Sequence, residues 1–224
     1  MAMITVRNLS KHYDDKIVYD GFNLDIEENK VLAILGKSGC GKTTLLNILA
    51  GLTDCEGQIE GDIKPVSMLF QKDYLVPNLT VEKNLKLVCK NKDVLSALRE
   101  VGMEDCAKQY PKSLSAGMSR RIAIVRALLF ESSLLLMDEP TNSLDVGLKN
   151  KVYSILKVLK EKYPKTIVVV THDIDEALSI ADRVVVIEGG QIEYSYNFKT
   201  LISDRDITDD ECSLVRKELL SRLL

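Results

Sequence analysis

The sequence predicts an α/β fold in which a mainly parallel β-sheet is covered by helices on both faces. A glycine-rich run, residues 36–43, separates an apolar run typical of a buried strand, Val31–Leu35, from an apolar helix at 44–50. Two further β-branched runs, 167–170 and 184–187, are short and continuous, as buried strands of parallel sheets are. Helical patterns alternate with these strands, and this order is typical of a sheet between two helical layers.

Other segments add to this core. Residues 1 to about 30 alternate in short runs with turn signals, Asp20-Gly21 among them, and a similar stretch covers about 58–70, so both predict an antiparallel β subdomain. The pattern from about 74 to 113 is helical and polar, which predicts an inserted helical subdomain. A last helix starts at about Asp209 and is expected to pack through four apolar residues, Leu214, Val215, Leu219 and Leu220.

Composition limits the class of protein. The chain has 224 residues, of which 46% are hydrophobic, enough for a full core. No apolar stretch approaches the roughly 20 residues that span a bilayer, and residues 1–7 lack a signal-peptide layout, so we expect a cytoplasmic protein. The net charge of −3, with mixed signs, argues against nucleic acid as the main ligand. The scattered cysteines suit free thiols in a reducing compartment rather than metal ligands: Cys40, Cys55, Cys89, Cys106 and Cys212.

The glycine-rich run fits the phosphate-binding pattern G-x-x-x-x-G-K-[ST] at every fixed position. Glycines let the backbone wrap around phosphates, so that successive N–H groups and a helix N-terminus face the anion. Lys42 would reach the β- and γ-phosphates, and the Thr43 hydroxyl would bind Mg²⁺. The run therefore predicts a nucleoside triphosphate site made of Gly36, Lys37, Ser38, Gly39, Cys40, Gly41, Lys42, Thr43 and Thr44.

A second motif indicates the reaction. The apolar run 134–137 ends in two adjacent carboxylates, Asp138 and Glu139. On a strand next to the phosphate loop, Asp138 can hold the Mg²⁺ shell while Glu139 faces the γ-phosphate and polarises a water. Such a pair fits attack by water better than transfer to a bound acceptor. The motif therefore favours a hydrolase over a kinase.

A third motif indicates the family. The run Leu-Ser-Ala-Gly-Met at 114–118, followed by an amphipathic helix, resembles the L-S-G-G-Q signature of ATP-binding cassette (ABC) proteins. The other motifs of that family are present in order over essentially the whole chain. Gln71 resembles the Q-loop glutamine, and Asp145, within 142–145, resembles the D-loop aspartate. His172 resembles the switch histidine and Tyr13 the aromatic residue that stacks on adenine, although Tyr13 also fits an ordinary tyrosine and His172 a structural residue at a strand end.

The resemblance implies a site that one chain cannot complete. In the family, two cassettes close head to tail around two ATP molecules, and each signature acts on the ATP of the other subunit. Glu139, His172 and Gln71 would then be catalytic, and Thr43, Gln71 and Asp138 would hold Mg²⁺, the last through water. The signature would comprise Ser115, Ala116, Gly117 and Met118, of which Ala116 and Met118 depart from the family pattern.

The same resemblance implies one ABC ATPase domain over 1–224. Its core would comprise about 1–73 and 114–224, and the helical subdomain with the signature about 74–118. The motifs are most similar to those of bacterial importers of the nitrate, sulfonate and taurine type. The expected partners are ATP, a second cassette, transmembrane permease subunits that hold the chain at the inner face of the membrane and, indirectly, an extracytoplasmic solute-binding protein.

Two alternatives stay open: the ATPase of a separate-span exporter or lipoprotein-release system, and a non-transport ABC protein acting on DNA or the ribosome. Four apolar residues after the Q-loop glutamine are predicted to line a groove for a permease helix, or else to be ordinary core residues: Tyr74, Leu75, Val76 and Leu79.

Overall fold

A computed structural model describes residues 3–14, 16–61, 63–89, 93–142 and 144–223. Its centre is a six-stranded sheet in the order β5-β6-β7-β3-β8-β9. All neighbouring pairs are parallel except β8 with β9. The strands are β3 Val31–Leu35, β5 Val66–Leu69, β6 Leu134–Asp138, β7 Thr166–Val170, β8 Arg183–Glu188 and β9 Gln191–Asn197.

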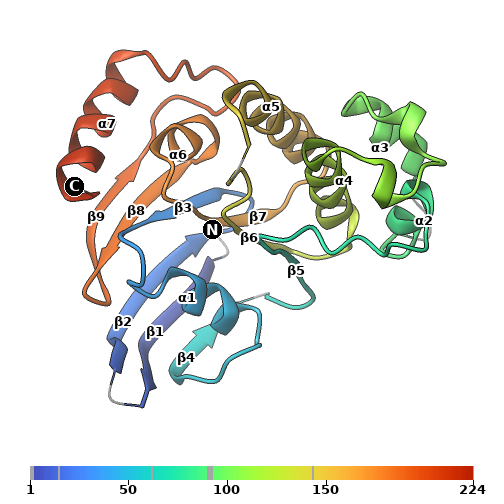
Figure 1. Cartoon of the computed structure of the whole chain (residues 1–224). Coiled ribbons are helices and arrows are strands. Elements are labelled where there is room, and N and C mark those ends of the chain that lie inside the picture. The colour runs from blue at the N-terminus through green and yellow to red at the C-terminus, as the bar shows by residue number, and fades with distance from the viewer. Residues whose placement is uncertain (1–2, 15, 62, 90–92, 143, 224) are drawn as a thin grey trace.

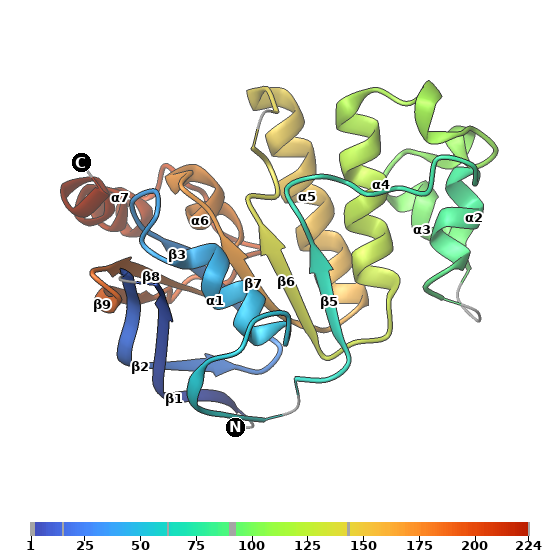
Figure 2. The same ribbon diagram turned by 60° about the horizontal axis from the view of Figure 1, so that its bottom comes forward.

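Helices cover both faces of this sheet, as Figures 1 and 2 show. Alternate side chains of each strand point to opposite faces: on β3, Leu32 and Ile34 pack towards α1, whereas Ala33 and Leu35 pack towards α6 and α7. The same alternation on β6 sends Leu135 towards α4 and α5. The helices are α1 Lys42–Leu49, α2 Val81–Lys86, α3 Val94–Glu100, α4 Ala116–Leu129, α5 Val146–Lys162, α6 Ile174–Ile180 and α7 Asp210–Leu223, with short 3₁₀ turns at Glu104–Cys106 and Pro111–Ser113.

A second sheet of three antiparallel strands lies beside α1. It has the order β2-β1-β4 and consists of β1 Met3–Tyr13, β2 Lys16–Glu27 and β4 Glu56–Glu60. Two details of the prediction for this region were wrong. The dipeptide at 20–21 lies inside β2, where Gly21 takes a positive φ of 65° beside an irregularity in the pairing. In the stretch 58–70 only β4 joins the antiparallel sheet, because β5 pairs in parallel with β6.

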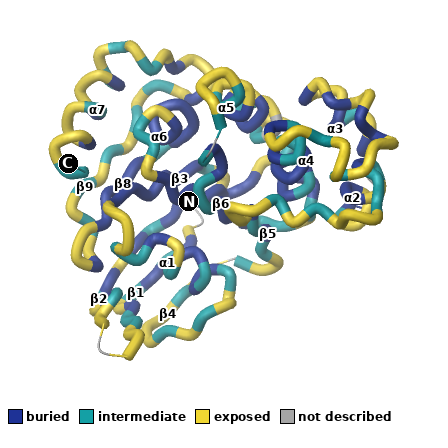
Figure 3. The backbone as a smooth tube through the Cα atoms, viewed as in Figure 1, coloured by how far each residue is buried: buried dark blue, intermediate teal, exposed yellow. Residues whose placement is uncertain are grey.

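The segment 74–113, predicted to be helical, contains the short helices α2 and α3 and the two 3₁₀ turns. Helices α2 and α3 pack against each other and against α4. The buried residues of this segment, hereafter the helical arm, belong to the same hydrophobic cluster as Leu135 and Met137 of β6. The helical arm therefore shares its core with the central sheet. Figure 3 shows the contrast between the buried central strands and the exposed outer parts of this arm. The division of the chain into a core and a separate helical subdomain at about 74–118 stays a prediction.

The packing face of α7 differs from the prediction. Val215 and Leu219 are buried together with Cys212, whereas Leu214 is 69% and Leu220 41% exposed. One turn of a helix is 3.6 residues, so Leu214 and Leu220 fall outside the narrow stripe that contacts α6. Among the described residues, no helix is both long enough and apolar enough to cross a membrane.

Candidate active site

The phosphate loop lies between the end of β3 and the start of α1. Gly41 precedes the first residue of α1 with a φ of 105°, a conformation that side-chain-bearing residues rarely adopt. A Cβ atom there would also stand 2.6 Å from Val18 Cγ1. The loop can therefore enter the helix only because glycine occupies this position, and the free N–H groups of the first turn of α1 face the loop.

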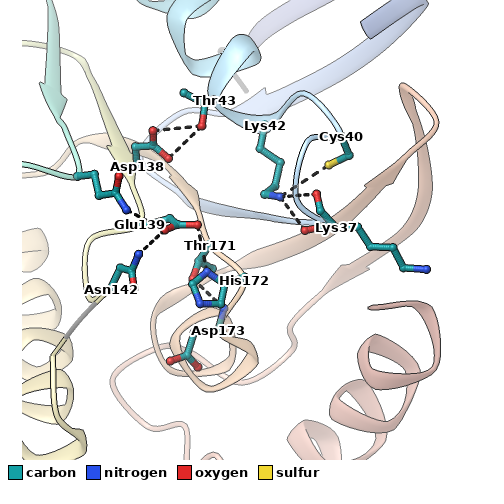
Figure 4. Close-up of polar contacts among 12 residues, drawn as sticks. Lys37, Cys40, Lys42, Thr43, Asp138, Glu139, Asn142, Thr171, His172 and Asp173 are labelled. Atoms are coloured by element: carbon teal, nitrogen blue, oxygen red, sulfur yellow. Dashed lines mark hydrogen bonds and ion pairs between the residues drawn. The ribbon is translucent and has the colours of Figure 1, made fainter. Parts of the chain in front are cut away.

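Lys42 lies inside this loop. Its ammonium donates to the carbonyl oxygens of Gly36 at 2.6 Å and of Lys37 at 2.9 Å, as Figure 4 shows. The side chain is 9% exposed. The loop thus holds a buried positive charge beside its row of N–H groups, which is the arrangement that a polyphosphate needs.

A hollow of about 350 Å³ joins the loop to two other predicted site residues. Tyr13 and Glu139 line it together with residues of the loop and of the start of α1: Ser38, Gly39, Gly41, Lys42, Thr43 and Thr44. The Tyr13 side chain is 45% exposed, and the Lys11 ammonium lies 5.0 Å from the centre of its ring. A hollow of this size, lined by an aromatic ring and by the phosphate loop, can take a nucleotide.

Thr43 and Asp138 meet at the metal position that the sequence predicts. The Thr43 hydroxyl donates to the two Asp138 carboxylate oxygens at 3.2 and 3.4 Å. Burial raises the pKa of Asp138, while the hydrogen bond from Thr43 lowers it. Hard oxygen ligands suit Mg²⁺, which prefers one or two protein oxygens plus water and substrate phosphates. Within the described ranges, no group of three or more His, Cys, Asp or Glu side chains is placed to hold a metal ion.

Glu139 follows β6 in a strained backbone conformation. Its φ of 46° is in the left-handed region, which typically costs a non-glycine residue about 1–3 kcal/mol. The Glu139 N–H donates to the Val170 carbonyl at 2.8 Å, and the Glu139 carbonyl accepts from Arg120 at 3.2 Å. These bonds turn the chain sharply at the strand end and direct the carboxylate towards the loop (Figure 4).

Three side chains converge on the Glu139 carboxylate. Oε2 accepts from Asn142 Nδ2 at 2.7 Å and lies 3.5 Å from Gln71 Nε2. His172 Nδ1 lies 3.0 Å from Oε1, a hydrogen bond when this nitrogen carries the proton. The structure therefore brings together the three predicted catalytic residues, Gln71, Glu139 and His172, which follow β5, β6 and β7. Figure 4 shows Asn142 and His172 beside the Glu139 carboxylate.

The signature residues lie elsewhere. Ser115 caps α4 and accepts from the Met118 N–H at 3.2 Å, and neither it nor Ala116, Gly117 or Met118 lines the hollow. Figures 1 and 2 place α4 on the far side of β5 and β6 from α1. Asp145 caps α5 by accepting from the Leu148 N–H at 2.9 Å. These predicted residues are thus apart from the phosphate loop of the same chain.

Two residues near the site were not assigned a role from the sequence. Asn142 falls in the predicted D-loop, and its spacing of three residues from Glu139 in a turn could have indicated the contact. Arg120 is 5% exposed and binds the carbonyls of Phe70 and Glu139. No signal in the sequence separates Arg120 from its neighbour Arg121, because both follow the signature directly.

A hollow with a phosphate loop, a hydroxyl-carboxylate metal position and a buttressed carboxylate is typical of enzymes that hydrolyse nucleoside triphosphates. Comparison with known proteins defines the class further. The model of the ABC transporter family matches residues 19–142. The aliphatic sulfonates import ATP-binding protein SsuB 3 of Paraburkholderia xenovorans is 39% identical over 202 residues, covering 88% of this chain and 81% of the relative.

Further relatives are named for the import of aliphatic sulfonates or of spermidine and putrescine. SsuB 1 of Paracoccus denitrificans, also an aliphatic sulfonates import protein, is 43% identical over 84% of this chain and 81% of its own. The spermidine/putrescine import ATP-binding protein PotA of Clostridioides difficile is 40% identical over 85% of this chain and 61% of its own. Among solved structures, the dimeric bacterial ABC transporter cassette MJ0796 has a TM-score of 0.74 and 31% identity, covering 88% of this chain and all of the other.

The chain belongs to the ABC transporter family of ATP-binding cassettes. It is an ATP hydrolase of that type with the α/β fold of the family. A second structure of MJ0796 carries ADP and inorganic phosphate in a post-hydrolysis state and is 29% identical, with the same TM-score of 0.74.

Proposed function

We propose that two copies of this chain, or this chain and a homologous cassette, close around two ATP molecules with Mg²⁺ and drive solute import through separate permease subunits. The main support is the set of import ATP-binding proteins that are 37–43% identical over most of the chain. Dimeric MJ0796 supports the paired arrangement. The permease and an extracytoplasmic solute-binding protein would select the solute, and the chain would lie peripherally at the inner face of the membrane.

Glu139 is the proposed general base. It lines the same hollow as the phosphate loop, and its two oxygens are held by Gln71, Asn142 and His172. A carboxylate held in this way can orient a water against the γ-phosphate and accept its proton. Bound Mg²⁺ would supply charge neutralisation at the phosphates, with Thr43 and Asp138 as its protein ligands. Gln71 as a further ligand stays a prediction, since its amide nitrogen faces Glu139 here.

Replacing Glu139 by Gln tests this assignment. The change keeps the shape and removes the basic oxygen, so ATP turnover should fall about 10²–10⁴-fold while ATP affinity is retained. The matched comparison is Lys42→Ala, which should lose ATP affinity because it removes the buried cation from the loop. Near-normal turnover in Glu139→Gln would mean that another group is the base.

The surface after β5 is the proposed docking site for the permease. Tyr74 is 63% exposed, and its ring lies against Phe70 at 5.6 Å between ring centres. A hollow of about 190 Å³ adjoins Phe70 and is lined further by Lys72, Asp73, Val88, Arg126 and Phe130. Of the four residues predicted for this groove, none lines the hollow, and Leu75 packs against the core. Tyr74 is therefore the residue with which to test docking.

Purification of the chain from membranes of cells that also express its permease tests whether the permease docks at Tyr74. Tyr74→Glu should remove the permease from the purified complex without changing the thermal stability of the free chain, because the side chain is exposed. Tyr110→Glu is the control: Tyr110 is 45% exposed on the same arm and outside the hollow. Retention of the permease by Tyr74→Glu would place the docking surface elsewhere.

A further inference from the structure

Arg120 connects two segments that carry proposed catalytic residues. This buried side chain of α4 donates from Nη1 to the Phe70 carbonyl at 2.7 Å and pairs with Asp73 at 3.0 Å. From its other side, Nη2 donates to the Glu139 carbonyl at 3.2 Å and Nε donates to the Pro140 carbonyl. One planar guanidinium thus joins the chain on both sides of Gln71 to the turn that holds Glu139.

The two segments are held where the backbone is strained. Both Glu139 and Tyr74 have left-handed φ values, 46° and 44°. Arg120 binds the Glu139 carbonyl, and Arg126, further along α4, donates to the carbonyls of Tyr74 at 3.0 Å and Asp73 at 2.9 Å. Unfavourable backbone conformations persist only where surrounding contacts fix them. The arginines of α4 supply such contacts for both segments.

The same helix begins with the signature. Ser115 is the N-cap of α4, and Arg120 comes less than two turns later on a rigid, buried helix. A movement of the N-terminus of α4 is therefore carried directly to the carbonyls of Phe70 and Glu139.

We infer that Arg120 is a positioning residue that couples the signature helix to the Gln71 and Glu139 of its own chain. This inference rests on the proposed roles of Gln71 and Glu139. When the partner's ATP contacts the signature, α4 is fixed, and Arg120 fixes the orientation of the Glu139 carboxylate. The coupling makes hydrolysis at one site depend on ATP at the other.

The variant Arg120→Lys tests this role. Lysine keeps the charge and fills most of the same space, but its single nitrogen cannot reach Phe70 and Pro140 from both sides, as the guanidinium fork does. We expect kcat for ATP to fall roughly 10- to 100-fold, as misplaced catalytic groups typically cause. KM and the affinity for ATP measured without turnover should change by about twofold or less, and the Hill coefficient for ATP should approach one.

Arg126→Lys is the matched control. Arg126 binds only the Asp73 and Tyr74 carbonyls and makes no contact with Glu139 or Pro140 among the described residues. Because Arg126 holds only the segment after Gln71, Arg126→Lys should lower kcat clearly less than Arg120→Lys does and should keep a Hill coefficient close to that of the wild type. Equal loss of kcat in both variants would assign the effect to the Gln71 segment alone and overturn the coupling through Glu139.

Two results separate this inference from the proposed function. Loss of turnover in Glu139→Gln together with wild-type kcat and Hill coefficient in Arg120→Lys contradicts only the role of Arg120. Normal turnover in Glu139→Gln contradicts the catalytic assignment itself, on which the role depends. If Arg120→Lys also lowers the melting temperature, kcat and KM are measured well below that temperature. Partial unfolding would remove ATP binding and hydrolysis together, whereas loss of positioning lowers kcat and leaves KM nearly unchanged.

Discussion

The Glu139 carboxylate is fixed by residues from three strand ends before any nucleotide contact is considered. Asn142 holds one oxygen at 2.7 Å, and His172 holds the other at 3.0 Å while keeping a side chain that is 62% exposed. A group with partners on both oxygens has little freedom to rotate, which reduces the reorganisation needed at the moment of reaction. The His172 side chain is exposed whereas Asn142 is half-buried, so His172 has more freedom than Asn142 to turn towards a phosphate.

Tyr13 offers a test of nucleotide binding at a single side chain. Stacking of an aromatic ring on a base contributes roughly 1–3 kcal/mol and tolerates different bases. Tyr13→Ala should therefore weaken ATP binding about tenfold or more, and the wild type should bind GTP nearly as well as ATP. Tyr110→Ala is the control, because Tyr110 is equally exposed at 45% and does not line the hollow. Titration of a fluorescent ATP analogue measures the ATP affinity of both variants. Unchanged affinity in Tyr13→Ala would show that Tyr13 is not part of the nucleotide site.

Glu176 gives the protein a defined pH dependence of stability. The residue is fully buried on α6, and burial raises the pKa of its carboxyl from 4.5 to about 7, although the nearby Thr171 and Thr141 hydroxyls act in the opposite direction. Asp173 raises this pKa further, and Lys149 lowers it. The neutral form is thus favoured in the folded state. Its contribution is complete below about pH 4.5 and is lost as the pH rises through about 7.

Glu176→Gln should remove this dependence. Because the shift corresponds to about 3 kcal/mol, the free energy of unfolding of the variant should gain on the wild type by up to that amount between pH 5 and 8. Denaturant unfolding at each pH measures the difference. Glu161→Gln, an exposed carboxylate at the end of α5, is the control and should follow the wild type throughout. A constant difference between Glu176→Gln and wild type would mean that Glu176 is ionised in the folded protein over the whole range.

The glycines at the two ends of helix α1 meet different structural requirements. Gly41 begins the helix against Val18 and the Tyr19 ring, whereas Gly51, with a φ of 71°, ends it with no atom within 4 Å of its missing side chain. At the far end the Gly51 N–H donates to the Ile48 carbonyl at 2.9 Å. Gly51 is therefore needed only for its backbone conformation, while Gly41 is needed for conformation and space.

The pair Gly41→Ala and Gly51→Ala separates these requirements. Gly51→Ala should lower the free energy of unfolding by about 1 kcal/mol and leave ATP affinity unchanged. Gly41→Ala should also displace the phosphate loop, since its new Cβ would lie 2.6 Å from Val18 Cγ1, and ATP affinity should fall by about tenfold or more. Isothermal titration with ATP and denaturant unfolding give the two quantities. Equal ATP affinity in both variants would show that the loop accommodates the methyl group.

Elements with strong periodicity were predictable from the sequence, and those set by tertiary contacts were not. The fold class and buried strands such as β3 and β7 follow from continuous apolar runs, and the structural relatives confirm the class. Strand β9, Gln191–Asn197, was not predicted, although Ile192, Tyr194 and Tyr196 alternate with polar residues, because its place at the sheet edge depends on antiparallel pairing with β8. In the same way, the sequence shows that α7 is amphipathic but not which of its leucines contact α6.

At the scale of the whole molecule, the residues predicted for the site lie in two separate parts of the structure. The phosphate loop, Thr43, Asp138 and Glu139 were predicted from fixed spacings, and the structure brings them together around one hollow. The clustering of Gln71, Asn142 and His172 on one carboxylate could not be read from the sequence, because it depends on three strands ending at one edge. The exposed signature residues Ser115 and Ala116 do not line this hollow, and their action on a second cassette stays a prediction.

The ATP-dependent dimer provides the last test. Glu139→Gln should hydrolyse ATP slowly enough for an ATP-bound dimer to be seen by gel filtration. Adding Ala116→Glu places a carboxylate where the signature would meet the partner's γ-phosphate, at the exposed first position of α4, where a negative charge is compatible with the helix dipole. This double variant should bind ATP as a monomer. Leu95→Glu, which adds the same charge near the N-terminus of α3, is the control and should leave the dimer intact. Persistence of the dimer with Ala116→Glu would show that the signature of this chain does not face the second ATP.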